Sequence, residues 1–409
     1  MQNSITNRIR IIGIVITAGC IYSSCKTAKP VSQATVNSQP AAIKINLQQR
    51  RTYSFSDGTV QFSNQFAGAR VNNIEQQDNS HYTITISPEN TPVNPSPWYA
   101  FKVWGKQQTI DVQMKYVGTR HRYDPKISKD GGKTWEDLAV KKSKTDSNAG
   151  FQLSISADTL LVAAQELMPA AMGYQWIDSL ATLPFIHKEI VGYSIMGKPI
   201  VALNTTGSSG KKQIIILSRQ HPPEVTGYMA MQEFIRTVMG NSSLAVAFRK
   251  EYEVIVVPML NPDGVDEGNW RHSAGGVDLN RDWENFEQPE TRSVKEFLVK
   301  KQTAQQATVY FAIDFHSTYN DVFYTNEDTL TNVPGLTNRW LRRFAESIPG
   351  FKPNVKPSGN GGNVSKGWLM RAFKTDALTY EVGDDTPRPL LKKKGKVAAE
   401  VLMQLLLRG

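Results

Sequence analysis

The 409-residue sequence has only two cysteines, and both lie within its first 25 residues. The chain after Cys25 therefore contains no disulfide framework. Long apolar runs are also missing, because the run Ile11–Ala18 is too short to span a bilayer. Although the formal net charge is +10, the basic residues form no stripe with interleaved aromatic side chains. The composition therefore argues against a nucleic-acid partner.

The first 25 residues have the pattern of an export signal. Arg8 and Arg10 precede the apolar run 11–18, and small residues follow around Cys20 and Cys25. The two cysteine segments resemble the cleavage site of bacterial lipoproteins, so we expect residues 1–25 to be a signal peptide whose removal leaves a lipid-carrying cysteine. Ordinary secretion with two incidental cysteines is the alternative. In the first case the protein is exported to the cell envelope, in the periplasm or at the cell surface, and meets the membrane only through that anchor.

The rest of the chain divides into three parts by composition and pattern. Residues 26–45 are rich in Ser, Thr, Gln, Ala and Pro, which is typical of a flexible tether. Residues 46–162 alternate apolar and polar positions between turn residues, which predicts a small antiparallel β-sandwich domain. In residues 163–409 strand-like and helical segments alternate, which predicts an α/β domain with a mixed central sheet flanked by helices.

Within this last part, short apolar runs mark the strands and longer amphipathic segments mark the helices. The expected strands are 190–194, 200–205, 213–218, 253–259, 309–314 and 377–382, and the clearest helices are 222–239 and 397–407. In sheets of this kind, functional sites form beyond the carboxyl ends of the strands.

The segment Ile214–Gly227, IIILSRQHPPEVTG, joins a buried strand to two candidate metal ligands. Because proline is tolerated in the first turn of a helix, we expect His221 near the N-cap and Glu224 about one turn into the helix. Residues three apart on a helix are neighbours, so an imidazole and a carboxylate would converge at the strand end. Glutamate in a first helical turn is also favoured by the helix dipole, so this pair alone does not decide for a metal.

Further polar motifs follow the other predicted strands. They are Asn261–Gly264 (a turn by composition), Asn269–His272, Val277–Trp283, His316 within DFHS, and Glu381 within YEVG. Taken in this order, the motifs resemble those of the zinc carboxypeptidase family over about residues 165–409. The preceding β-domain, with Pro97–Phe101 and the turn Ser128–Trp135, looks most like the N-terminal domain of the cytosolic carboxypeptidase branch, which includes tubulin deglutamylases and bacterial relatives.

The resemblance implies one zinc ion per chain as the cofactor. Its ligands would be His221, Glu224 and His316, and Asp278 would orient His221. Two imidazoles and one carboxylate leave one position of a tetrahedral zinc ion open for water, whose pKa then falls to about 7. An aspartate behind a ligating histidine fixes the tautomer of that histidine.

The resemblance also implies the residues that meet the substrate. Glu381 would be the general base, which takes a proton from water and passes it to the leaving amine. Arg271 would polarise the scissile carbonyl, while Asn280 and Arg281 would hold the terminal carboxylate, a task that suits the planar, permanently charged guanidinium. The expected function is that of a zinc metallocarboxypeptidase that hydrolyses the C-terminal peptide bond of peptides or proteins.

Two other classes of function stay open. One is a zinc amidohydrolase that acts on a non-peptide amide or a cell-wall stem peptide, and the motifs Asn261–Gly264 and Trp270–Arg271 argue against it. The other is a surface-binding protein without activity, and the complete ligand set together with Glu381 argues against that. The sequence departs from many relatives at Pro223, where they carry arginine, and in the loop 357–362, which has no tyrosine. Both departures concern specificity rather than chemistry.

Overall fold

The computed structural model describes residues 42–142, 148–326, 331–358 and 362–408. The expected signal peptide with Cys20 and Cys25, and most of the expected tether, lie outside the described residues. Within the described ranges, no helix combines the length and apolarity that crossing a bilayer would need. Residues Pro40–Gly409 form one compact unit.

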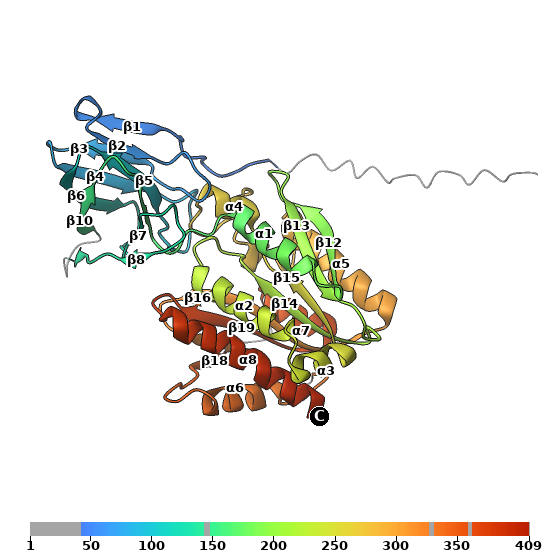
Figure 1. Cartoon of the computed structure of the whole chain (residues 1–409). Coiled ribbons are helices and arrows are strands. Elements are labelled where there is room, and N and C mark those ends of the chain that lie inside the picture. The colour runs from blue at the N-terminus through green and yellow to red at the C-terminus, as the bar shows by residue number, and fades with distance from the viewer. Residues whose placement is uncertain (1–41, 143–147, 327–330, 359–361, 409) are drawn as a thin grey trace, which may run out of the picture. The chain divides into compact units, whose positions relative to one another are not determined.

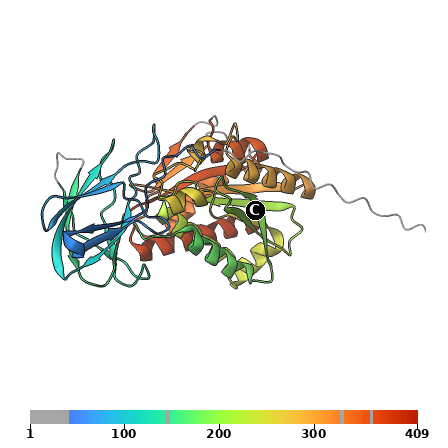
Figure 2. The ribbon, with the colours of Figure 1, turned by 90° about the horizontal axis from the view of Figure 1, so that it is seen from above.

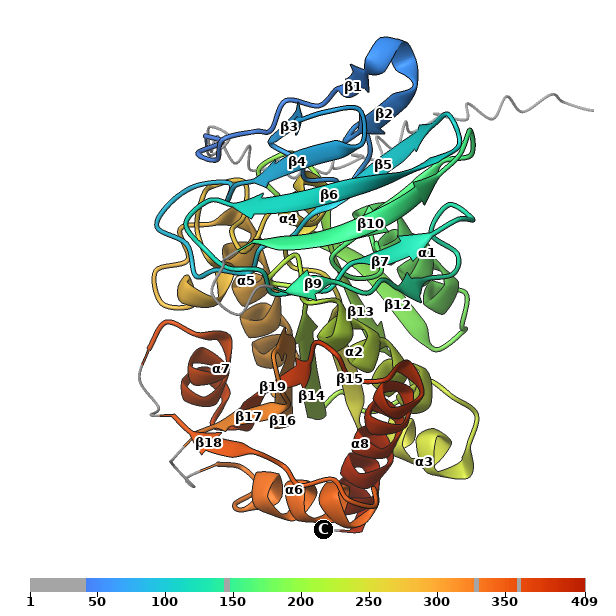
Figure 3. The same ribbon diagram turned by 90° about the vertical axis from the view of Figure 1, so that its left-hand side faces the viewer.

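The first eleven strands form a β-sandwich of two sheets (Figure 3). Their bounds are β1 (Thr52–Phe55), β2 (Val60–Ser63), β3 (Asn73–Gln76), β4 (His81–Ile86), β5 (Ala100–Gly105), β6 (Gln108–Tyr116), β7 (Lys126–Ser128), β8 (Glu136–Asp137), β9 (Lys141–Lys142), β10 (Ala149–Ile155) and β11 (Leu160–Ala163). One sheet has the order β1-β2-β5-β11-β7-β8 and the other β3-β4-β6-β10-β9. The described strand pairs are antiparallel, except that β4 runs parallel to β6.

The alternating pattern of the sequence explains how the two sheets pack. In β4 the side chains of Tyr82, Ile84 and Ile86 are buried, whereas the residues between them face outward. The inward residues of both sheets form one core, in which the rings of Phe62 and Tyr82 lie 5.3 Å apart between centroids. The predicted β-sandwich is confirmed, while its exact limits at residues 46 and 162 stay predictions.

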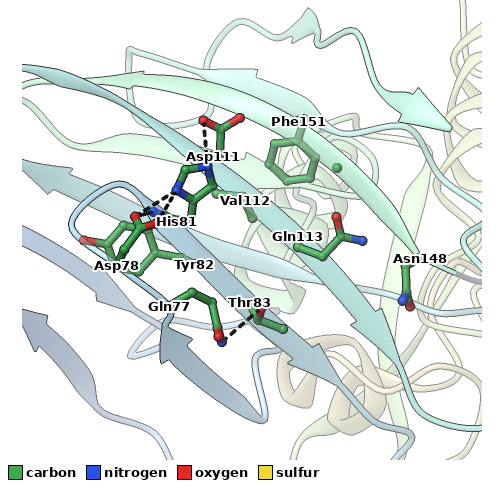
Figure 4. A pocket seen from close by; sticks show the side chains of 11 residues that line it. Gln77, Asp78, His81, Tyr82, Thr83, Asp111, Val112, Gln113, Asn148 and Phe151 are labelled. Atoms are coloured by element: carbon green, nitrogen blue, oxygen red, sulfur yellow. Dashed lines mark hydrogen bonds and ion pairs between the residues drawn. The ribbon is translucent and has the colours of Figure 1, made fainter. Parts of the chain in front are cut away.

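The outer face of the second sheet carries a shallow surface pocket of about 530 Å³ (Figure 4). His81 is one of its lining residues, with Nδ1 2.8 Å from Asp78 Oδ1 and Nε2 3.7 Å from Asp111 Oδ2. The other histidine of the sandwich, His121, lies 2.7 Å from the hydroxyl of Tyr116. Both histidines are thus held by neighbours within the sandwich.

The second part of the chain is built on one eight-stranded sheet with the order β12-β13-β15-β14-β16-β19-β17-β18 (Figure 1). The strands are β12 (Ile186–Tyr193), β13 (Pro199–Thr205), β14 (Lys212–Ser218), β15 (Glu253–Val257), β16 (Thr308–Thr318), β17 (Val322–Thr325), β18 (Val355–Pro357) and β19 (Asp376–Gly383). The central strands β15, β14, β16 and β19 run parallel to one another. Their carboxyl ends therefore meet at one edge of the sheet.

Helices cover both faces of this sheet (Figure 1 and Figure 2). They are α1 (Ala170–Ala181), α2 (Val225–Val238), α3 (Ser243–Glu251), α4 (Pro262–Glu267), α5 (Pro289–Gln305), α6 (Leu336–Glu346), α7 (Ser365–Phe373) and α8 (Arg388–Arg408). Helices α1, α2, α3, α6 and α8 contribute to the core on one face, and α5 and α7 to the core on the other. The predicted mixed α/β fold is confirmed.

Two local expectations were wrong. Helix α2 begins at Val225 rather than at Pro222, because a residue that precedes proline, here Pro222, is disfavoured in the helical region. The segment that begins at Asn261 is a helix start rather than a plain turn. The Asn261 side chain accepts a hydrogen bond from Gly264 N, and Pro262 occupies the first position of α4.

Candidate active site

The side chains of His221, Glu224 and His316 converge on one buried point. His221 Nδ1 lies 2.8 Å from Glu224 Oε1, His316 Nδ1 lies 2.7 Å from Glu224 Oε2, and the two Nδ1 atoms are 3.1 Å apart. Ligands about 2.0–2.1 Å from a tetrahedral zinc ion lie about 3.3 Å from one another. The three donors thus fit a shared cation in both their chemistry and their spacing.

The sheet brings these residues together from distant parts of the sequence. His221 follows the end of β14, and Glu224 is the residue that precedes α2. His316 lies inside β16, which continues beyond the predicted strand end as far as Thr318. Because β14 and β16 are parallel neighbours, their carboxyl ends place the two histidines side by side.

Each candidate ligand histidine is held from behind by an aspartate. His221 Nε2 lies 2.8 Å from Asp278 Oδ1, a contact that the family resemblance implied. His316 Nε2 lies 2.8 Å from Asp314 Oδ2, a contact that the sequence analysis missed. These contacts leave the Nδ1 atom of each ring directed at the common point, which is how a carboxylate partner orients a ligating histidine.

Asp314 belongs to a buried network that reaches beyond the candidate metal site. Its Oδ2 atom accepts hydrogen bonds from Gln220 Nε2 and Ser365 Oγ, each at 2.5 Å. Gln220 immediately precedes His221, and its Oε1 accepts from Trp283 Nε1 at 2.9 Å. The network therefore connects the two histidine-bearing segments with the start of α7.

Glu381 lies on β19, directly beside His316 in the parallel pairing of β16 and β19. Its side chain lines the same cavity as His221 and Glu224, and its Oε2 atom has no hydrogen-bond partner among the described residues. Burial and the nearby Glu224 carboxylate raise the pKa of Glu381 to about 7. A carboxyl group of this kind can hold or release a proton near neutral pH.

The loop between α4 and α5 supplies three further predicted residues. Arg271 Nε donates to Asp278 Oδ2 at 2.6 Å, so Asp278 contacts both Arg271 and His221. The Oδ1 atom of Asn280 accepts from Ser365 N at 2.9 Å, which leaves the Nδ2 atom near His316 Nε2 at 3.5 Å. Arg281 is solvent-exposed and forms no ion pair with the described carboxylates.

The charged groups of the site shift one another's pKa values so that each stays ionised. Burial opposes ionisation of Glu224, but the nearby histidines His221 and His316 hold its pKa below the ordinary value. Asp278 is likewise buried, and His221 and Arg271 hold its pKa low. Burial would lower the pKa of Arg271, but Asp278 and Glu224 raise it, so its guanidinium stays charged.

These residues open on a cavity of about 440 Å³. The predicted residues His221, Glu224, Arg271, Asn280, Arg281 and Glu381 line it, whereas His316 and Asp278 are not among the lining residues. The segment from β17 to β19 adds Tyr324, Ser358, Val364, Lys366 and Thr379. Lys366 is buried, and its Nζ atom donates to Asn326 Oδ1 and Ser358 O, each at 3.0 Å.

The β-sandwich also contributes to the cavity, through residues that the sequence analysis did not select. Asn94, Pro95 and Arg122 line it. The Arg122 guanidinium lies 2.9 Å from Asp384 Oδ2 and over the ring of Tyr319, 4.7 Å from its centroid. These contacts join segments more than 100 residues apart, so no local pattern in the sequence predicts them.

Comparison with known proteins agrees with this arrangement. Residues 173–353 match the zinc carboxypeptidase family. Mouse cytosolic carboxypeptidase 6 is 25% identical over 372 residues, which cover 80% of this chain and 69% of the mouse protein. Cytosolic carboxypeptidase 6 of Caenorhabditis elegans is 31% identical over 289 residues, which cover 64% of this chain and 62% of the nematode protein. The crystal structure of a metallo-carboxypeptidase from Burkholderia cenocepacia superposes with a TM-score of 0.69 at 17% identity, over 85% of this chain and 98% of that one, and so shares the fold.

Proposed function

From the premise that this chain carries a zinc carboxypeptidase domain, homologous to cytosolic carboxypeptidases and bacterial metallocarboxypeptidases, we propose that it removes single residues from free C-termini of peptides or proteins. The family makes the protein a hydrolase of the metallocarboxypeptidase class. The single observation that carries the proposal is the meeting of a His–Glu–His cluster, two arginines and the Glu381 carboxyl group, whose Oε2 atom has no hydrogen-bond partner among the described residues.

His221, Glu224 and His316 would hold the zinc ion, because their donor atoms already face one another. When bound, zinc supplies a Lewis acid that polarises a carbonyl oxygen and lowers the pKa of a water ligand to about 7. Asp278 and Asp314 would keep the two imidazoles in the tautomer that presents Nδ1 to the cation.

Glu381 would act as the general base and then as the general acid. Its carboxyl group faces the cavity, and burial keeps the pKa near the range in which a proton can be both accepted and returned. It would remove a proton from the attacking water and deliver a proton to the leaving amine. The nitrogen of the released residue thereby gains the proton that the water loses.

Two arginines would bind two polar groups of the substrate, the scissile carbonyl and the terminal carboxylate. Arg271 is fixed against Asp278 and kept charged, so it would stabilise the negative charge that develops on the carbonyl oxygen. Arg281, which forms no ion pair with the described carboxylates, would bind the terminal carboxylate of the substrate together with Asn280. This pairing would limit cleavage to the last peptide bond.

The proposal is tested with a set of peptides that differ only in their C-terminus. Each sequence is offered to the zinc-loaded protein with a free and with an amidated C-terminus, and the products are read by mass spectrometry over time. We expect stepwise loss of single residues from the free peptides, suppression by a chelator, and recovery on addition of zinc. Internal cuts, or equal cleavage of free and amidated peptides, would contradict exopeptidase action and favour an amidohydrolase.

A further inference from the structure

The loop that carries Arg271 is held by a carboxylate from the β-sandwich. Glu89, which follows β4, is completely buried. Its Oε2 atom accepts a hydrogen bond from the backbone N–H of Trp270 at 2.7 Å. Its Oε1 atom accepts from the backbone N–H groups of Arg271 at 3.0 Å and His272 at 2.7 Å. One side chain thus satisfies three consecutive backbone donors.

Neighbouring contacts fix the same loop to the sandwich. The Trp270 ring is 1% exposed and packs within the core of the β-sandwich rather than that of the eight-stranded sheet. Asn90 hydrogen-bonds His272 Nδ1 and donates to Gly276 O at 2.9 Å. Arg70 donates to Asn269 Oδ1 at 2.9 Å. The loop therefore takes its position from the β-sandwich on both sides of Arg271.

The position of the loop determines where the Arg271 side chain enters the cavity. Its Nε atom donates to Asp278 Oδ2, and Asp278 in turn contacts His221 Nε2. A continuous chain of hydrogen bonds thus runs from Glu89 through Arg271 and Asp278 to a candidate zinc ligand. Because the N–H of Arg271 itself is bound by Glu89, the start of its side chain is fixed at the backbone.

We propose that Glu89 is a positioning residue for Arg271, so that the β-sandwich is a working part of the active site. This inference rests on the proposed function, in which Arg271 stabilises charge on the scissile carbonyl. Without the Glu89 carboxylate, three backbone N–H groups, two of them in buried hydrogen bonds, would lack their acceptor, and the loop would have to move to satisfy them. Displacement of a catalytic group by about 1 Å lowers the rate about 100-fold.

The experiment compares Glu89→Gln and Glu89→Ala with the wild-type protein. Glutamine fits the same space, but its NH₂ group faces an N–H donor, so part of the acceptor set is lost. We expect kcat to fall about 10-fold in Glu89→Gln and about 100-fold in Glu89→Ala, while KM and bound zinc stay near the wild-type values. Hydrogen exchange of the backbone amides in residues 268–276, followed by mass spectrometry, should accelerate in both variants.

Glu166→Gln is the matched control. Glu166 follows β11 and forms an ion pair with Arg388 at the start of α8, with 2.6 Å between Glu166 Oε2 and Arg388 Nη2. This pair is partly buried, and neither residue lines the cavity. We expect Glu166→Gln to lose stability without a change in kcat or in the exchange of residues 268–276.

The outcomes separate the inference from the proposed function. If the wild-type protein does not release C-terminal residues, the proposed function fails, whereas faster exchange at 268–276 in Glu89→Gln would still establish the loop contact. Normal kcat in Glu89→Gln, or a loss that is confined to KM or accompanied by zinc loss, would overturn the positioning role. If Glu89→Ala does not fold, Glu89→Asp provides the second variant. It keeps the charge but withdraws it by one methylene, and we expect the same fall in kcat as for Glu89→Ala.

Discussion

Substitution of Asp314 tests how the candidate zinc ligands are held. Within the described part of the chain, three hydrogen bonds reach this buried side chain, from Gln220, Ser365 and His316, and all converge on Oδ2. Its Oδ1 atom has no hydrogen-bond partner among the described residues. Asp314 therefore contacts the candidate metal site through one oxygen atom, which orients the His316 ring.

The geometry gives different expectations for two variants. In Asp314→Asn the amide oxygen can take the place of Oδ2 and keep all three hydrogen bonds, so only the charge behind His316 is lost. In Asp314→Ala every acceptor is lost, and the buried Gln220 and Ser365 donors would each cost about 1–3 kcal/mol of stability. Loss of such a partner lowers metal affinity about 10–100-fold, or about 1.4–2.7 kcal/mol. We expect the asparagine variant near the lower limit and the alanine variant near the upper limit.

The assay measures the zinc dissociation constant of the metal-free protein by competition with a chromogenic chelator at fixed pH. His316→Ala, which removes a ligand, sets the lower reference for affinity. Asp263→Asn is the control, because Asp263 is equally buried but contacts Ser194 and the Met196 N–H outside the cavity. Wild-type zinc affinity in Asp314→Ala would refute the reasoning, and equal losses in both Asp314 variants would show that charge rather than contact dominates.

Four other predictions follow from the structure and the sequence. Glu381→Gln should keep zinc but lose about 10³–10⁴-fold in kcat, and near-normal turnover in a stopped assay would assign the proton transfer to another group. Arg281→Ala should lower kcat/KM by one to two decades, from about 1.5–3 kcal/mol of charged hydrogen bonding, and amidation of the substrate should then have little further effect. Burial raises the pKa of Glu290 to about 7, above its ordinary value of 4.5, so folding stability falls as pH rises between these values. Urea unfolding should therefore find Glu290→Gln more stable than wild type by up to about 3 kcal/mol at pH 8 and nearly equal to it at pH 4. Replacement of both Cys20 and Cys25 by alanine should release the protein from membranes, and unchanged membrane association in cell fractions would count against a lipid anchor.

The convergence of His221 and Glu224 could be predicted because both residues lie in one short segment, directly after an apolar run. His316 and Glu381 could be placed for a related reason. Each lies at the carboxyl end of a predicted strand, and neighbouring parallel strands end at the same edge of the sheet. The contact between Asp314 and His316 could also be predicted from the local sequence. Residues two apart on a strand point to the same face, so an aspartate two positions before His316 lies beside it.

The exact start of α2 and the partners of Asp314 could not be predicted in the same way. Helix α2 begins at Val225, after the second of two prolines, and in this case the restriction on a residue before proline outweighs the tolerance of proline in a first helical turn. Gln220 and Ser365 reach Asp314 from positions 94 and 51 residues away along the chain. Contacts over such distances depend on packing of the whole sheet, and a single sequence carries no period that encodes them.

Glu89 shows most clearly why the role of the β-sandwich could not be derived from composition. Glu89 stands between Pro88 and Asn90, two residues that favour turns, and such a segment is ordinarily solvent-exposed. Yet Glu89 is 0% exposed, which is rare for a glutamate unless its carboxyl group is fully paired. Its partners are backbone N–H groups 181 to 183 residues further along the chain, so neither end of the contact is visible locally. Since these N–H groups belong to the loop that carries Arg271, the position of that loop depends on a side chain from the β-sandwich. In the sequence the β-sandwich looks like a separate domain. Through Glu89, however, it fixes the loop that carries Arg271.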